Sequence, residues 1–89
     1  MKTINDELTA LMSTINDNII LEKTLNIQDI ASQYVGTDRH DDIAELLESI
    51  LIIAHECKRS VSNSHKQTIY KILRSTSNMV MEWKYDSTL

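Results

Sequence analysis

The chain has 89 residues, of which 42% are hydrophobic and 25% are charged, and its net charge is −4. A chain of this length forms one domain with a small core, and mild acidity argues against a general DNA-binding protein, which needs excess positive charge. One glycine and no proline interrupt the sequence. Because these two residues are the main helix breakers, we expect a single all-α domain over residues 1–89, with a frayed tail at 85–89.

The single cysteine, Cys57, cannot form a disulfide within the chain, which favours a reducing compartment. The first residues lack the apolar core of a signal peptide, and the longest apolar run, Ile50 to Ala54, is too short to span a membrane. We therefore expect a cytoplasmic protein. The surplus of aliphatic residues on so short a chain predicts a homodimer, since small folds often need a second copy to cover their apolar surface.

The first helix is predicted to begin at Thr3 as N-cap and to fade near Lys23. Its apolar residues recur every three or four positions and share one face, which we expect to be buried: Ile4, Leu8, Leu11, Ile15 and Ile19. A short second helix is predicted from Asn26 as N-cap, and Gly36 supplies the left-handed residue that ends it. Whether these two helices are continuous is left open by the sequence.

The third predicted helix begins at Thr37 or Asp38 and is the most apolar. Its centre is apolar on every side, so it must be covered all round, either at the middle of the fold or in a dimer seam. The residues assigned to this core or dimer seam are Leu46, Ile50, Leu51, Ile52 and Ile53. An Asp at position 52 or 53 is accordingly expected to unfold the protein or to split its oligomer.

The fourth helix is predicted to begin at Ser64, with Gln67 completing a capping box. Its buried face contains Ile69, Ile72, Leu73, Val80 and Trp83, with Thr76 filling the gap. The predicted fold is therefore a small bundle of three long helices and one short helix.

Charge is unevenly distributed along the chain: residues 1–57 carry a net −8 and residues 58–89 a net +4. Such asymmetry can orient a partner or a second copy. The basic residues expected to form a patch that binds an acidic partner are Lys58, Arg59, His65, Lys66, Lys71 and Arg74.

Two further patterns predict little chemistry. Residues 26–37 look like the first half of a helix-turn-helix, but the following helix would begin with three carboxylates that DNA phosphates repel. The cluster of Asp38, Asp41, Asp42 and Glu45 is explained by the helix dipole, which favours acids in a first turn. We expect no metal and no cofactor.

The segment Ala54-His55-Glu56-Cys57-Lys58-Arg59-Ser60 resembles the phosphorylated segment of histidine phosphotransfer domains, which are helical bundles. The resemblance implies that His55 is the phospho-accepting nucleophile and that Lys58, one turn later, neutralises the phosphoryl charge. Arg59 stands where that family has a small glycine.

The leading functional hypothesis is a small non-enzymatic regulatory or adaptor protein that docks to another protein, as a homodimer. The alternatives are a phosphotransfer-like protein that uses His55 and a weak nucleic-acid-binding regulator, although the basic residues lack the interleaved aromatic side chains that stack on bases.

Overall fold

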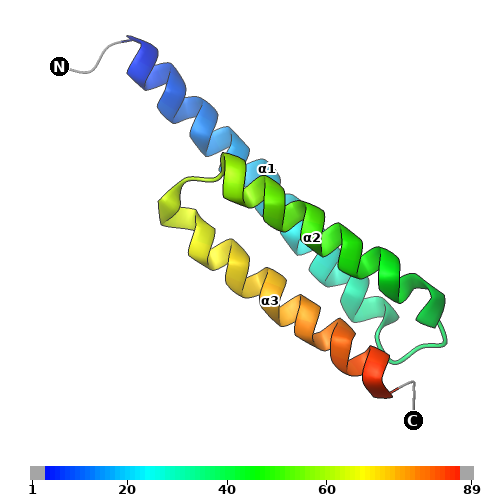
Figure 1. The fold of residues 1–89 in the computed structure, drawn as a ribbon. Helices are drawn as coiled ribbons and strands as arrows, with labels where there is room; N and C mark the ends of the chain where they lie inside the picture. The colour runs from blue at the N-terminus through cyan, green and yellow to red at the C-terminus, as the bar shows by residue number, and fades with distance from the viewer. Residues whose placement is uncertain (1–3, 87–89) are drawn as a thin grey trace.

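The structure, a computed structural model, describes residues 4–86, without the side chains of residues 4–6, 9, 10, 12 and 13. Within these residues the chain is all α-helical, as predicted, and contains helices α1 (Ile4–Tyr34), α2 (Ile43–Ser60) and α3 (Asn63–Asp86). A short 3₁₀ turn, η1 (His40–Asp42), precedes α2. The three helices run antiparallel from one to the next and pack together in a rod with extents of 62 × 16 × 15 Å (Figure 1). None of the described helices is both long enough and apolar enough to cross a membrane.

The short separate helix predicted from Asn26 does not exist, because α1 continues without a break through this position. Thr24 shows why a polar residue does not end the helix here: its hydroxyl donates to the carbonyl of Ile20, one turn earlier, at 2.8 Å. The predicted end at Gly36 is confirmed, since Gly36 has a φ of +86° just after α1. Residues other than glycine adopt that backbone conformation only at a cost in free energy.

The start of α2 was predicted wrongly: α2 begins at Ile43 rather than after Thr37 or Asp38. The Thr37 hydroxyl donates to the carbonyl of Tyr34 at the end of α1, at 2.6 Å, and accepts the amide of Arg39. Thr37 therefore stabilises the loop between α1 and α2 instead of capping α2. The Arg39 guanidinium also lies over the Tyr34 ring, 4.2 Å from its centre.

The core is an aliphatic layer between the three helices, closed near the α1–α2 loop by Trp83. The predicted face of α3 is confirmed by the burial of Ile69, Leu73, Thr76 and Val80. Trp83 also packs against His40 of η1, with ring centres 5.2 Å apart. Helix α3 extends through Asp86, two residues into the predicted frayed tail, and residues 87–89 lie outside the described part. The cap predicted at Thr3 lies outside it too.

Helix α1 buries a different face from the one predicted. The side chains that it contributes to the interior are Asp17, Ile20, Thr24, Ile27 and Ala31. The predicted buried row is exposed wherever its side chains are described, as detailed below. The reason is that α2 and α3 lie together on one side of α1, and the predicted row points to the other side.

Candidate interaction surface

The predicted seam on α2 divides into a buried part and an exposed part. Leu46, Ile50 and Ile53 lie in the core, whereas Leu51 and Ile52 are 58% and 51% exposed. The two other helices, α1 and α3, cover only one side of α2, so the expectation that the fold itself covers this segment all round is wrong. A dimer seam at Leu51 and Ile52 stays a prediction.

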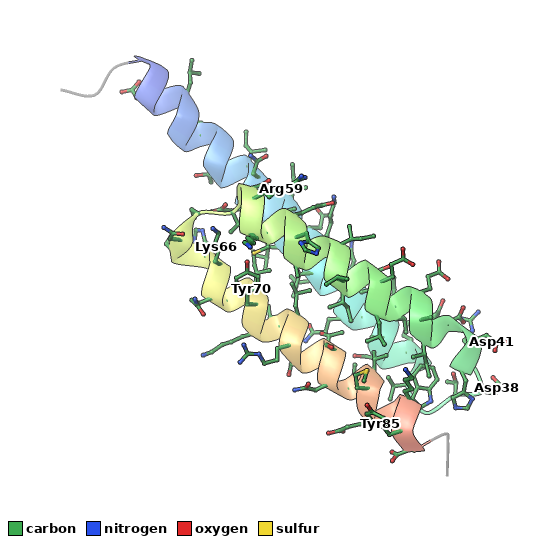
Figure 2. All side chains as sticks on the ribbon, in the orientation of Figure 1. Asp38, Asp41, Arg59, Lys66, Tyr70 and Tyr85 are labelled. Carbon is green, nitrogen blue, oxygen red and sulfur yellow. The ribbon has the colours of Figure 1, made fainter. Side chains whose placement is uncertain are left out.

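Three of the predicted basic residues lie at the end of the bundle where α2 turns into α3. Lys58 and Arg59 are exposed in the last turn of α2, and Lys66 is half-buried in the first turn of α3. Figure 2 shows Arg59 and Lys66 at this same end. We call Lys58, Arg59 and Lys66 the basic turn.

The remaining predicted basic residues lie apart from the basic turn. Lys71 and Arg74 are exposed further along α3. At about 100° per residue, they lie about 140° and 80° around the helix from Lys66. Helix geometry therefore separates the predicted patch into the basic turn and a second group on the outer side of α3.

His65, the last predicted member of the patch, is engaged in a polar cluster with Asp17 and Ser62. The Asp17 carboxylate accepts the Ser62 amide at 2.9 Å, the Ser62 hydroxyl at 2.5 Å and His65 Nδ1 at 2.6 Å. Because a carboxylate only accepts hydrogen bonds, Nδ1 carries the proton. These bonds tie α1 to the start of α3, and we call the three residues the Asp17 cluster.

The Asp17 cluster also explains why the predicted capping box is wrong. Helix α3 begins at Asn63, and the carbonyl of Ser62 accepts the amides of His65 and Lys66, both at 3.1 Å. Ser62 is therefore the residue at the helix start, and its hydroxyl donates to the Asp17 carboxylate instead of accepting a backbone amide of α3. Ser64 is exposed, with its hydroxyl 3.1 Å from that of Ser62.

Although it joins a serine, a histidine and an aspartate, the Asp17 cluster is not arranged as a catalytic triad. In a triad the aspartate and the serine bind opposite nitrogens of the imidazole. Here Ser62 Oγ lies 3.3 Å from Nδ1, the same nitrogen that contacts Asp17. The adjoining pocket between α1 and α3 has a volume of about 80 Å³, too small for most substrates. The arrangement suits a structural tie between two helices.

The pKa of Asp17 is shifted by its surroundings. Burial alone would raise it, but the hydrogen bonds from Ser62 and His65 outweigh that effect and hold the pKa below 3.8. A carboxyl group whose pKa is lowered by folding stabilises the fold when it is ionised, and this contribution disappears as the pH falls through the lowered value.

We therefore expect the free energy of unfolding to fall as the pH is lowered below about 3.8, partly through Asp17. Urea denaturation of the wild-type chain and of Asp17→Asn, followed by circular dichroism, measures this. The stability difference between the two proteins at about pH 5 should shrink at lower pH. A difference that is independent of pH down to about pH 2 would show that the Asp17 carboxylate contributes nothing.

An apolar row runs along the outer side of α1. Leu8, Leu11, Ile15 and Ile19 are 52%, 62%, 57% and 45% exposed. Steps of three and four residues place them on one helix face, and at about 100° per residue that face lies roughly opposite Ile20 and Ala31. We call these four residues the apolar row. Single exposed aliphatic residues are normal on a protein surface, but a continuous row indicates an interaction site.

Part of the apolar row lies on a segment of α1 that extends beyond the other two helices (Figure 1). The bonds of Asp17 to Ser62 and His65 place the α2–α3 turn beside residue 17 of α1. Residues 4–16 therefore form an overhang, about 20 Å long at 1.5 Å per residue. Isolated helices of this length are only marginally stable in water, so a partner that covers the row would also stabilise the overhang.

Two chemically distinctive side chains lie on α2. Cys57 is fully buried, and burial raises the pKa of its thiol, which bonds to the Tyr70 hydroxyl. A buried thiol with a raised pKa is a poor nucleophile. His55 is exposed on the outer side of α2, with Lys58 also exposed one turn later. The phosphotransfer role of His55 stays a prediction.

Comparison of the chain with protein families, with curated proteins and with solved structures found no match.

Sequence reasoning found the apolar row but assigned it to the core, and it missed the role of Asp17. The available signal was spacing: Asp17 lies three, seven and ten residues before Ile20, Thr24 and Ile27, on the same helix face. Because that face contains two polar residues, it is a weaker apolar pattern than the row.

Proposed function

We propose that this chain is a non-enzymatic regulatory or adaptor protein that acts by docking to another protein molecule through the apolar row of α1. The observation that supports the proposal is a helix face with four large aliphatic side chains, all about half exposed, which no described part of the chain covers. Anchors separated by three and four residues on one helix are the pattern by which amphipathic helices enter apolar grooves.

Charge at the base of the overhang, on the side of α1 away from the row, adds specificity to the proposed contact with a partner that encloses the overhang. The basic turn lies at the base of the overhang, because Ser62 between its two parts is bonded to Asp17. A protein that accepts the overhang is brought close to Arg59 and its neighbours. An acidic rim on that protein would gain favourable contacts and faster association, whereas a basic rim would be repelled.

A capture experiment tests the role of the row. Immobilised full-length chain and its Leu11→Glu variant are exposed to lysate, and bound proteins are identified by mass spectrometry. Leu11→Glu is expected to lose the specific partner, since a carboxylate cannot enter an apolar groove without a large desolvation cost.

The matched control is Leu25→Glu, because Leu25 is a 46% exposed leucine of the same helix that lies outside the row. This control should retain the partner. Reversing the charge of Lys58, Arg59 and Lys66 to Glu should weaken capture less than Leu11→Glu does, because exposed charges contribute little each. Equal capture by all four proteins would contradict the proposed function.

A further inference from the structure

We propose that His65 is a phosphoryl acceptor, and that its Nε2 takes a phosphoryl group from an activated donor such as a phosphoramidate or an acyl phosphate. The site lies in the groove between α1 and α3 and does not involve the apolar row. Three features support it: the contact of the imidazole with Asp17, the exposure of the other edge of the ring, and the polar groups beside that edge.

The Asp17 carboxylate determines which nitrogen of His65 is free to react. Its Oδ2 atom lies 2.6 Å from Nδ1, and the carboxylate side chain is 7% exposed whereas the imidazole side chain is 61% exposed. Because the carboxylate accepts the Nδ1 proton, the lone pair of the neutral ring lies on Nε2. The buried edge of the ring therefore holds the proton, and the exposed edge presents a nucleophilic nitrogen.

Transfer of a phosphoryl group to Nε2 needs no further base from the protein. The Nε2 lone pair forms the new bond to phosphorus while the bond from phosphorus to the leaving group breaks, and the leaving group keeps that electron pair. A phosphoramidate thus releases ammonia, and an acyl phosphate releases a carboxylate. The proton stays on Nδ1, so the ring becomes positively charged, and the ionised Asp17 stabilises that charge as the aspartate of a catalytic triad does.

The space beside the ring suits a phosphoryl group. The pocket of about 80 Å³ that His65 lines is also lined by Asn18 of α1 and Thr68 of α3. Both side chains are exposed, and an amide and a hydroxyl are donors for phosphoryl oxygens. A phosphoryl group has three acceptor oxygens and little bulk. A pocket too small for most organic substrates is therefore not too small for this group.

The charge at this end of the bundle favours an anionic donor. Residues 58–66 contain the three cations of the basic turn and no acidic residue. His65 itself lies in the first turn of α3, where the helix dipole favours negative charge. These positive charges attract a phosphate compound from solution over about 10 Å at 0.1 M salt.

The other two histidines provide a comparison within the same molecule. His40 and His55 are both exposed, and in the part of the chain that the structure describes neither imidazole is paired with a carboxylate. His40 packs against Trp83 instead. His55, the acceptor predicted from the sequence, lacks a group that would fix its proton on one nitrogen. We therefore expect His65 to be the most reactive of the three.

Treating the folded full-length chain with potassium phosphoramidate tests this expectation. The reaction is run at about pH 8.5, so that the imidazoles are neutral, and phosphorus and proton–nitrogen NMR spectra identify the modified residue and nitrogen. His65 should react about tenfold faster than His40 and His55, a modest effect for a positioned catalytic pair, and at Nε2 alone. Equal rates at the three histidines, or a phosphoryl group on Nδ1 of His65, would overturn the proposal.

An Asp17→Asn variant tests whether Asp17 positions the ring and stabilises its charge. The neutral amide cannot stabilise the imidazolium, so the rate at His65 should fall about tenfold, while His40 and His55 react as before. Asp29→Asn, which removes an exposed carboxylate of the same helix, is the matched control and should leave all three rates unchanged.

Circular dichroism checks that both variants are folded, and the wild-type comparison of the three histidines does not depend on either variant. A folded Asp17→Asn variant in which His65 reacts as fast as in the wild type would overturn the site. Either negative result leaves the proposed function unaffected, because capture of a partner through the apolar row does not involve His65.

Discussion

Replacing Ile53 with Asp is expected to unfold the chain, whereas the same change at the neighbouring Ile52 is expected to leave it folded. Ile53 is 8% exposed and lies in the core, while Ile52, about 100° further round the helix, is 51% exposed. An unpaired carboxylate in the core costs about 4 kcal/mol or more. That is a large share of the total stability of a small domain, about 5–15 kcal/mol. At Ile52, the cost is about 1 kcal/mol or less, mostly from helix propensity.

Circular dichroism and the fluorescence of Trp83 during urea denaturation measure both variants. Trp83 is buried at the end of the core near the α1–α2 loop, several turns of α2 away from Ile53, so its emission reports the loss of the whole bundle rather than a local change. The two variants serve as controls for each other, since they introduce the same charge into adjacent positions of one helix. If Ile52→Asp unfolds the chain as well, the outer side of α2 is covered in solution, and the dimer seam predicted there from the sequence is supported.

Removing the carboxylate of Asp17 is expected to cost about 2–3 kcal/mol of stability in an Asp17→Ala variant. Asp17 is 6% exposed and accepts bonds from the Ser62 amide, the Ser62 hydroxyl and His65. Hydrogen bonds to a charged group contribute about 1.5–3 kcal/mol each, and the loss here is limited because water can reach the exposed His65. The connection between α1 and the start of α3 is lost with them.

Asp29→Ala is the matched control, because Asp29 is an exposed carboxylate of the same helix. Within the part of the chain that the structure describes, it bonds only to Gln33 of α1, one turn later, at 3.1 Å. Its replacement should change the free energy of unfolding by about 0.5 kcal/mol or less. Chemical denaturation of both variants at neutral pH measures the difference. Equal losses for the two variants would show that the Asp17 cluster does not stabilise the bundle.

The sequence predicts the buried face of a helix well when that helix has one apolar face and no competing one. The faces of α2 and α3 that carry Ile50, Ile53, Ile69 and Val80 repeat with helical spacing, and they are buried as predicted. Helix α1 carries two such faces. The sequence favours the one without polar residues, yet the chain buries the one that contains Asp17 and Thr24.

Long-range contacts determine which face of α1 is buried. Asp17 bonds to Ser62 and His65, which lie 45 and 48 positions later in the sequence. These contacts fix where the α2–α3 turn lies against α1, and local spacing contains no information about that. The same contacts tie His65, an exposed member of the predicted basic patch, to Asp17 of α1. The basic turn itself was predictable, because Lys58, Arg59 and Lys66 are close in sequence and flank one short connection.

The continuity of α1 couples the apolar row mechanically to the bundle. No flexible residue separates the overhang from the segment that contains Ile20, so the direction in which the row points is set by the phase of a single helix. One alanine inserted after Asn16 would rotate the row by about 100° relative to the core, whereas seven inserted residues would return it to within about 20°. The direction of the apolar row is therefore preserved by the insertion of whole helical turns and changed by the insertion of a single residue.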